Sequence, residues 1–116
     1  MDWSIIEFIK KTTSMKIVLK GIHRADDAIK AVKYGCDGII VSNHGGRQLD
    51  GTPGTIDMLA MISLALKKDG LKDKIEIIFD GGIRRGTDIF KAFALGANAV
   101  MCGRASLWGL GAGGKD

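Results

Sequence analysis

The amino-acid sequence predicts an α/β fold in which parallel β-strands alternate with α-helices. Four short runs are continuously apolar and rich in β-branched residues, which is typical of strands that are buried on both faces of a sheet. These runs span residues 16–19, 38–41, 75–79 and 98–102. Segments with helical periodicity precede the first run and separate the others. Such alternation indicates a parallel sheet with right-handed crossover connections.

One helix is expected before the first strand and one after each of the first three strands. Their apolar stripes are, in chain order, Trp3, Ile6 and Ile9; Ala28, Ile29 and Val32; Ile56, Leu59, Ile62 and Leu66; and Ile89, Phe90, Phe93 and Ala94. Gly35 and Gly96 follow two of these stripes as C-terminal stops, and Thr55 precedes one as an N-cap. A glycine-rich tail at residues 109–114 is the one low-complexity tract.

Two architectures share this order of elements: a small open α/β sheet, and four consecutive units of an eight-stranded β/α barrel. The chain has 116 residues, of which 26% are charged and 46% are apolar, as in an ordinary single globular domain. No apolar run approaches the about 20 residues that cross a bilayer, so we expect no membrane span. The net charge of +4 is spread along the helices without basic runs, so we expect no nucleic-acid partner.

Cys36 and Cys102 lie far apart, outside any spacing typical of metal ligands. Each adjoins an apolar run, where a cysteine is usually a small buried hydrophobic residue. We therefore expect two buried thiols and no metal site. Unpaired cysteines favour an intracellular location, either cytoplasmic or peroxisomal.

Each predicted strand is followed by residues that are capable of binding or catalysis. Lys20 follows the first strand, residues 42–47 (SNHGGR) the second, residues 80–82 (DGG) the third and residues 103–104 (GR) the fourth. The C-terminal ends of parallel strands meet at one edge of a sheet, where α/β proteins bind their ligands. We therefore expect these four groups to form one site.

Residues 80–87 (DGGIRRGT) lead directly into a predicted helix and favour an anion. Glycines let a ligand approach the backbone, and N–H groups at a helix start attract negative charge. Arg84 and Arg85 add planar donors that suit a phosphate, and residues 103–104 would complete the pocket if these strands are the last two of a barrel. Asp80 would repel a phosphate, so we assign it to neutral hydroxyl groups nearby, such as those of a ribityl chain.

His44 and Arg47 lie three residues apart in a glycine-bearing loop. An imidazole can accept a proton near neutral pH. A guanidinium can hold a carboxylate through two hydrogen bonds. The pair is what proton abstraction from a carboxylate-bearing substrate requires.

The segment at 42–50, SNHGGRQLD, resembles the signature of the FMN-dependent 2-hydroxy-acid oxidases and dehydrogenases, which include glycolate oxidase, lactate oxidase, mandelate dehydrogenase and flavocytochrome b2. The resemblance covers nearly the whole chain, with IVLKGI at 17–22, DGGIRRGTD at 80–88 and GR at 103–104. It implies that residues 1–116 are the C-terminal half of such an enzyme, forming the last four strands of a TIM (β/α)8 barrel.

The resemblance implies FMN as the cofactor and oxidation of a 2-hydroxy acid to a 2-keto acid. His44 matches the active-site base, which would take either the α-carbon proton or the hydroxyl proton, and Arg47 matches the arginine that holds the substrate carboxylate. Lys20 matches the lysine beside flavin N1 and O2, Ser42 a contact of the flavin ring, and Asp80 a residue bonded to the ribityl hydroxyls. The phosphate-binding set is matched by Gly82, Arg84, Gly103 and Arg104.

Because such a barrel has eight strands, the chain is expected to be a fragment with little activity alone. The resemblance also implies groups that this half lacks, including a second carboxylate-binding arginine and the aspartate that orients the histidine. Four strands leave two unpaired sheet edges, so we expect the chain to pair with its missing N-terminal half-barrel or with a second copy of itself.

Two alternative functions stay open: a non-catalytic half-barrel that binds FMN or another phosphate ligand, and a phosphate-binding barrel of other chemistry. The SNHGGRQ string at 42–48 disfavours the second alternative, because the phosphate-binding barrels of other chemistry that share the DGGIRxG element have no matching histidine and arginine there.

Overall fold

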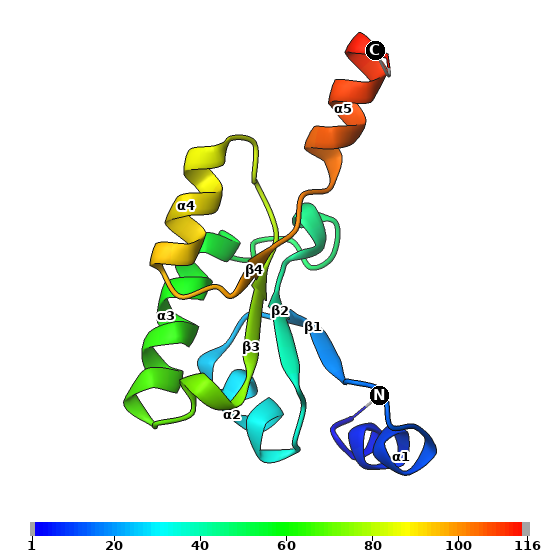
Figure 1. Cartoon of the computed structure of the whole chain (residues 1–116), viewed down its shortest axis with the longest axis vertical. Coiled ribbons are helices and arrows are strands. Elements are labelled where there is room, and N and C mark those ends of the chain that lie inside the picture. Colours follow the sequence, from blue (N-terminus) through cyan, green and yellow to red (C-terminus); the bar gives the residue numbers. More distant parts are fainter. Residues whose placement is uncertain (1, 115–116) are drawn as a thin grey trace.

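A computed structural model describes residues 2–114 of the chain and confirms the predicted alternation of strands and helices (Figure 1). In chain order the elements are α1 (Ser4–Thr12), β1 (Val18–Ile22), α2 (Ala25–Lys33), β2 (Gly38–Val41), the 3-10 helix η1 (His44–Gly46), α3 (Thr55–Lys68), the 3-10 helix η2 (Lys72–Lys74), β3 (Glu76–Phe79), α4 (Gly86–Ala94), β4 (Ala99–Val100) and α5 (Arg104–Gly113).

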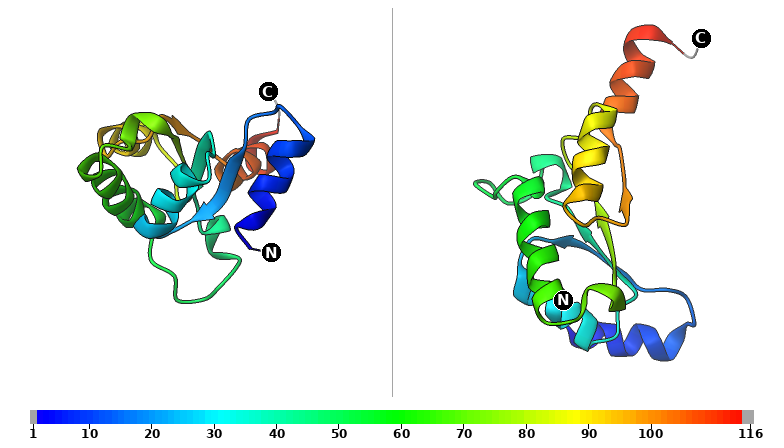
Figure 2. Two further views of the ribbon diagram at one scale, coloured as in Figure 1. Left: turned by 90° about the horizontal axis from the view of Figure 1, so that it is seen from below. Right: turned by 60° about the vertical axis from the view of Figure 1, so that its left-hand side comes forward.

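The four strands form one parallel sheet in the order β1-β2-β3-β4. Helices α2, α3 and α4 cover one face of this sheet, and α5 extends away from it (Figures 1 and 2). A doubly wound open sheet would reverse its strand order and carry helices on both faces. The sequential order is that of consecutive units of a β/α barrel. The α/β fold class predicted from the sequence is therefore confirmed.

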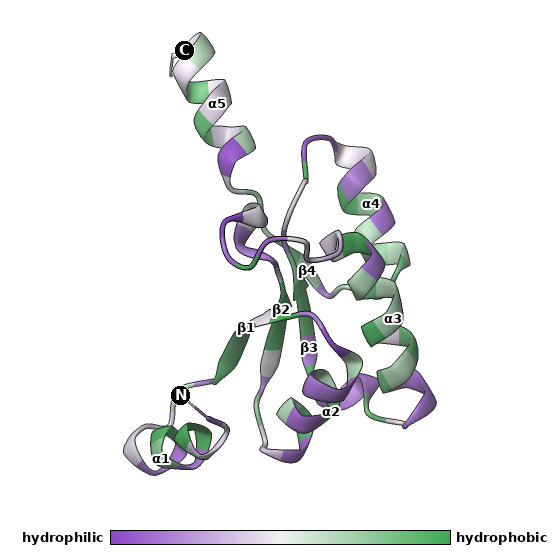
Figure 3. Ribbon diagram, turned by 180° about the vertical axis from the view of Figure 1, so that it is seen from behind, coloured by the Kyte–Doolittle hydropathy of each residue, from purple (hydrophilic) through white to green (hydrophobic). Residues whose placement is uncertain are grey.

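The core lies between the sheet and the helices that cover it. The buried side chains that meet there are Ile39, Val41, Ile77 and Phe79 from the strands and Ala28, Ala31, Leu59, Ile62 and Leu66 from the helices. The strands carry the most continuous hydrophobic colour in Figure 3. Ile40 and Ile78 alternate with the buried strand residues, point to the opposite face and are only half-buried. In a closed barrel this second face lines the interior.

Strand β1 begins two residues later than the sequence predicts and extends through Lys20 and Gly21. Gly21 has a φ of +92°, and the pairing with β2 shifts register between Lys20 and Ile22. This irregularity is a β-bulge, which a glycine accommodates readily. Lys20 therefore lies inside the strand and not after it. Strand β4 comprises Ala99–Val100 only, which is shorter than the predicted run at 98–102.

The predicted stripes match α1, α2 and, from Leu59 onward, α3. Gly54, and not Thr55, is the N-cap of α3, and Thr55 is its first helical residue. The stripe predicted on α4 is exposed, with Phe90 and Phe93 74% and 47% accessible, and Ala92 is the residue of α4 that is buried. The stop signal at Gly35 is confirmed, since this residue has a φ of +72° and its N–H donates to Val32 O.

Cys36 is buried as predicted, but Cys102 is exposed. Cys102 follows the short strand β4, and its thiol donates a weak hydrogen bond to Ile83 O at 3.7 Å. The glycine-rich tail is also more regular than its composition suggests, because α5 continues to Gly113. The intracellular location inferred from the cysteines stays a prediction. Among residues 2–114, no helix is long and apolar enough to cross a membrane.

Candidate active site

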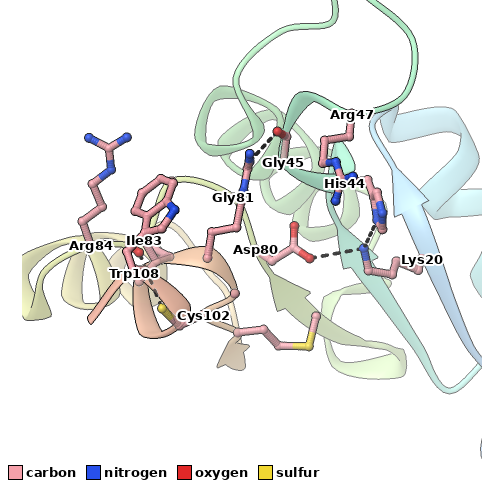
Figure 4. A pocket seen from close by; sticks show the side chains of 15 residues that line it. Lys20, His44, Gly45, Arg47, Asp80, Gly81, Ile83, Arg84, Cys102 and Trp108 are labelled. Carbon is pink, nitrogen blue, oxygen red and sulfur yellow. Dashed lines mark hydrogen bonds and ion pairs between the residues drawn. The ribbon is translucent and has the colours of Figure 1, made fainter. Parts of the chain in front are cut away.

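One cavity of about 380 Å³ lies at the C-terminal edge of the sheet and gathers the predicted site residues (Figure 4). Those that line it are Lys20, His44, Arg47, Asp80, Gly82, Arg84, Gly103 and Arg104. Ser42 does not line the cavity but contacts two residues that do. The convergence of the four strand ends is therefore confirmed, while the chemical role of each residue stays a prediction.

Ser42 joins Lys20 to His44 at the end of β2. Its side chain is buried, and its Oγ accepts a hydrogen bond from Lys20 Nζ at 3.1 Å. The same oxygen accepts a second hydrogen bond from the backbone N–H of His44, also at 3.1 Å. A buried hydroxyl with two donors is fully engaged as an acceptor. Ser42 therefore restricts the positions of the Lys20 ammonium and of the His44 backbone.

Lys20 also reaches the His44 ring and the Asp80 carboxylate, as Figure 4 shows. Lys20 Nζ lies 3.3 Å from His44 Nδ1 and 3.4 Å from Asp80 Oδ2. An ammonium group has donors only, so Nδ1 must be the acceptor. In this geometry the neutral His44 ring carries its proton on Nε2, and its lone pair on Nδ1 faces Lys20.

One carboxylate oxygen of Asp80 has no hydrogen-bond donor among the described residues. Its Oδ2 faces Lys20, whereas Oδ1 is buried and has no hydrogen-bond partner among the described residues. A buried carboxylate oxygen without a donor is costly, and buried polar groups in folded proteins normally have partners. A ligand that brings a hydroxyl donor to this point would remove that cost. The ribityl chain of FMN fits this requirement.

The other end of the cavity suits a phosphate. A Cβ atom at Gly82 or Gly103 would meet nothing within 4 Å, so a ligand can approach the backbone at both positions. The Arg84 guanidinium lies at this end and stacks over the Trp108 ring, 5.9 Å from its centroid. Arg104 also lines the cavity, and its Nη2 donates to Gly45 O at 2.5 Å. Two guanidinium groups beside exposed backbone form a cationic cradle.

Two N–H groups just before the first helical residue of α4 already have a partner within the chain. The Asp88 carboxylate accepts the backbone N–H groups of Arg84 at 3.0 Å and Arg85 at 2.9 Å. These two hydrogen bonds hold the pKa of Asp88 below its ordinary value. Arg85 is exposed and does not line the cavity. Arg84 and Arg104 therefore bring positive charge to the cavity, and Arg85 does not.

The loop that presents His44 has an unusual backbone. His44 has a φ of +55°, and among the described residues it alone has a positive φ without being a glycine. The side chain of Asn43 accepts the N–H of Gly46 at 3.1 Å and so closes the turn. Left-handed backbone at a non-glycine residue is strained, and such strain is concentrated at functional sites. This turn directs both His44 and Arg47 to the cavity.

Several residues around the cavity were missed by the sequence analysis. Met101, Cys102 and Trp108 line it. Trp108 lies on α5, where the glycine-rich tail disguised a helix. His23 lies beside the cavity, and its Nε2 contacts the backbone oxygen of Ser42. Its place three residues after Lys20, beyond a strand end, was the available signal.

Comparison with known proteins shows the same assignment over the whole chain. Residues 1–116 match the family model of the FMN-dependent dehydrogenases. The chain is 53% identical to 2-hydroxyacid oxidase 1 of Mus musculus, over 95% of this chain and 28% of that protein. It is 50% identical to L-lactate oxidase of Nostoc sp., over 99% of this chain and 30% of that protein.

Solved structures agree with these relatives. A flavocytochrome b2 double mutant with sulfite bound superposes with a TM-score of 0.93 at 46% identity, over 99% of this chain and 30% of that chain. Mandelate oxidase with (S)-4-hydroxymandelic acid superposes with a TM-score of 0.87 at 46% identity, over 98% of this chain and 31% of that chain. The chain thus spans less than a third of the length of these relatives. Its placement in their C-terminal half stays a prediction. The family match, the high TM-scores and the cavity together show that the chain belongs to the FMN-dependent dehydrogenase family.

Proposed function

We propose that this chain supplies the flavin-binding and proton-accepting part of a site that oxidises 2-hydroxy acids to 2-keto acids with FMN. The observation that carries the proposal is the single cavity that Lys20, His44 and Asp80 line together with Arg84 and Arg104. The printed names of two relatives, a 2-hydroxyacid oxidase and an L-lactate oxidase, support the same class of substrate.

Within this proposal, different residues of the cavity bind different parts of FMN. Arg84 and Arg104, with the exposed backbone at Gly82 and Gly103, hold the phosphate. Asp80 Oδ1 accepts a hydroxyl of the ribityl chain, because the described part of the chain offers this buried oxygen no donor. Lys20 places its positive charge beside N1 and O2 of the flavin ring, with Ser42 supporting it from below. When bound, FMN accepts the two electrons that leave the substrate.

Arg47 and His44 act on the substrate in this proposal. The Arg47 guanidinium holds the carboxylate through two hydrogen bonds. The His44 ring accepts the proton that the substrate loses. Its lone pair lies on Nδ1, facing Lys20 at 3.3 Å, so proton transfer requires either that this contact opens or that the ring changes tautomer.

We also infer that turnover needs strands beyond the four present here. The sheet ends in two edges, β1 and β4, that have no further strand beside them among the described residues. One observation favours the non-catalytic alternative for the chain alone. The groups suited to phosphate and ribityl binding are all present, whereas His44 Nδ1 faces a cation instead of the carboxylate that would orient the ring for proton transfer.

A chimaeric enzyme tests the proposal. In it, this chain replaces the matching segment of the Mus musculus 2-hydroxyacid oxidase 1. We expect the chimaera to bind FMN and to oxidise 2-hydroxy acids. The His44→Gln variant should keep its FMN, while substrate-dependent flavin reduction falls about 100-fold or more, because general-base catalysis is lost.

The conservative variant Arg47→Lys is the matched control for substrate binding. It keeps the positive charge but loses the bidentate hydrogen bonds to the substrate carboxylate, so it should raise KM with a smaller effect on kcat. A folded, FMN-loaded chimaera that does not reduce its flavin with any 2-hydroxy acid would establish the non-catalytic alternative. Unchanged turnover in His44→Gln would remove His44 from the role of base.

A further inference from the structure

His23 lies next to the site but outside the cavity. It follows the bulge at Gly21 and stands at the end of β1, where its side chain is half-buried. Its Nε2 contacts the backbone carbonyl oxygen of Ser42, which follows the end of β2. A carbonyl oxygen can only accept a hydrogen bond, so Nε2 must be the protonated nitrogen of the His23 ring.

This contact links the two strands beyond the point where their backbones pair. The last residues in register are Ile22 and Val41, after a bulge that uses an extra residue of β1. The next residue of each strand, His23 and Ser42, is joined by the imidazole instead of by the backbone. The His23 side chain therefore continues the connection at the point where the ladder of β1 and β2 ends.

Ser42 forms hydrogen bonds with both Lys20 and His44. Its hydroxyl accepts from Lys20 Nζ and from the His44 N–H, both at 3.1 Å. Its carbonyl accepts from His23. Movement of the Ser42 peptide would change where the hydroxyl lies, and with it the distance of 3.3 Å between Lys20 Nζ and His44 Nδ1. The position of the reactive pair thus depends on a residue that neither of them touches.

We propose that His23 is a positioning residue, which holds the Ser42 peptide and thereby sets the geometry of Lys20 and His44. It does not line the cavity and so is not a catalytic residue. Its importance for turnover rests on the proposed function. Its geometric role requires neither FMN nor substrate and can be tested without either.

Nitrogen NMR of the ¹⁵N-labelled chain tests this role directly. The chain has two histidines, so its imidazole spectrum contains two rings, and His44→Gln assigns them. We expect His23 to be a fixed Nε2–H tautomer in the unliganded chain. A neutral His23 ring with its proton on Nδ1, or one that averages over both tautomers, would overturn the proposal.

Two substitutions of His23 distinguish its hydrogen bond to Ser42 from the packing of its side chain. His23→Gln keeps an N–H donor that can reach the Ser42 carbonyl, whereas His23→Leu fills similar space without a donor. We expect the His44 ring nitrogens to shift in His23→Leu, toward the average of two exchanging tautomers, and to return to the wild-type position in His23→Gln. The melting temperatures of both variants serve as the control for folding.

Either of two results would contradict the proposal: His44 signals that are unchanged in His23→Leu, or signals that move equally in both variants. If His23→Leu fails to fold, the tautomer of His23 in the wild-type chain still tests whether His23 donates to the Ser42 carbonyl. A chain that passes these tests while the chimaera fails to oxidise 2-hydroxy acids would leave His23 as a positioning residue and reject the proposed function instead.

Discussion

Asp80 and Lys20 show how a few side chains at the end of a strand define a ligand. The carboxylate of Asp80 is largely buried, yet among residues 2–114 its one partner is the Lys20 ammonium at 3.4 Å. A fold that needed this carboxylate only for stability would satisfy both of its oxygens. The unsatisfied Oδ1 therefore points to a donor that the ligand brings.

The substitution Asp80→Asn should weaken FMN binding. It removes the negative charge that accepts the ribityl hydroxyl, and hydrogen bonds to charged groups contribute about 1.5–3 kcal/mol. This corresponds to a loss of affinity of about tenfold or more. Flavin fluorescence titration measures it, with Asp73→Asn, on the exposed turn η2, as the control. Equal affinities for both variants and the wild type would remove Asp80 from the site.

At the scale of elements, apolar periodicity predicted every strand and the helices α1 to α4. The predicted stripes of α1, α2 and α3 supply buried residues to the core, whereas α4 buries Ala92 and leaves its predicted stripe exposed. Where the predicted boundaries of elements were wrong, the cause is local. The bulge at Gly21 extends β1 past Lys20, and bulges leave no trace in an apolar pattern. Helix α5 was missed because glycines disfavour helices in isolation, and its side chains contribute nothing to the core.

The same contrast holds for the site. The convergence of Lys20, His44 and Asp80 could be predicted, because parallel strands bring their C-terminal ends to one edge. The partner of the Arg84 and Arg85 N–H groups could not be predicted, because the Asp88 carboxylate reaches them only once α4 has formed. Likewise, nothing in the sequence places Trp108 beside the phosphate loop.

Removal of the Asp88 side chain should destabilise the chain in a pH-dependent way. The hydrogen bonds from two backbone N–H groups lower the folded-state pKa of this carboxyl below its ordinary value of 3.8. Its stabilising contribution is therefore complete above that value and is lost as the pH falls through the lower, folded-state pKa. We expect Asp88→Ala to melt a few degrees below wild type at pH 7 and no lower than wild type in strong acid.

Asp88→Asn is the matched variant, because its amide oxygen can still accept both N–H groups but carries no negative charge. It should melt between the other two proteins at pH 7, with thermal unfolding followed by circular dichroism. A difference between Asp88→Ala and wild type that stays constant down to the lowest pH would show that the carboxylate charge is not what stabilises α4.

Helix α5 should contribute to FMN binding through Trp108. Its ring lies 5.9 Å from the Arg84 guanidinium, and exposed cation–π contacts contribute about 0.5–1 kcal/mol. We expect Trp108→Leu to weaken FMN binding by about two- to fivefold and Trp108→Phe to restore most of the loss. Trp3→Phe is the control, because Trp3 stacks on Tyr34 instead of lining the cavity. Identical affinities for Leu and Phe at position 108 would exclude the aromatic contact.

At the scale of the whole molecule, the chain presents an open sheet with two edges. Strands β1 and β4 each have one neighbour, and the face opposite the helices is only partly buried at Ile40 and Ile78. Unpaired edges and uncovered apolar faces promote association.

The isolated chain should therefore self-associate, as two half-sheets can cover each other's faces. Sedimentation velocity should show a mass that rises with concentration. Val18→Lys adds a charge to the exposed end of the edge strand β1 and should reduce this association, because inward-pointing charges protect sheet edges. A monodisperse monomer at all concentrations would contradict the expectation that the open sheet needs a partner.

The most direct test of the central claim is an FMN titration of the chain and of two neighbouring arginine variants. Arg84 lines the phosphate end of the cavity, while Arg85 does not, so Arg85→Gln controls for the loss of one positive charge. We predict saturable binding that weakens about tenfold or more in Arg84→Gln and remains near the wild-type value in Arg85→Gln. Absence of binding, or an equal loss in both variants, would contradict the claim that this chain carries a preformed flavin phosphate site.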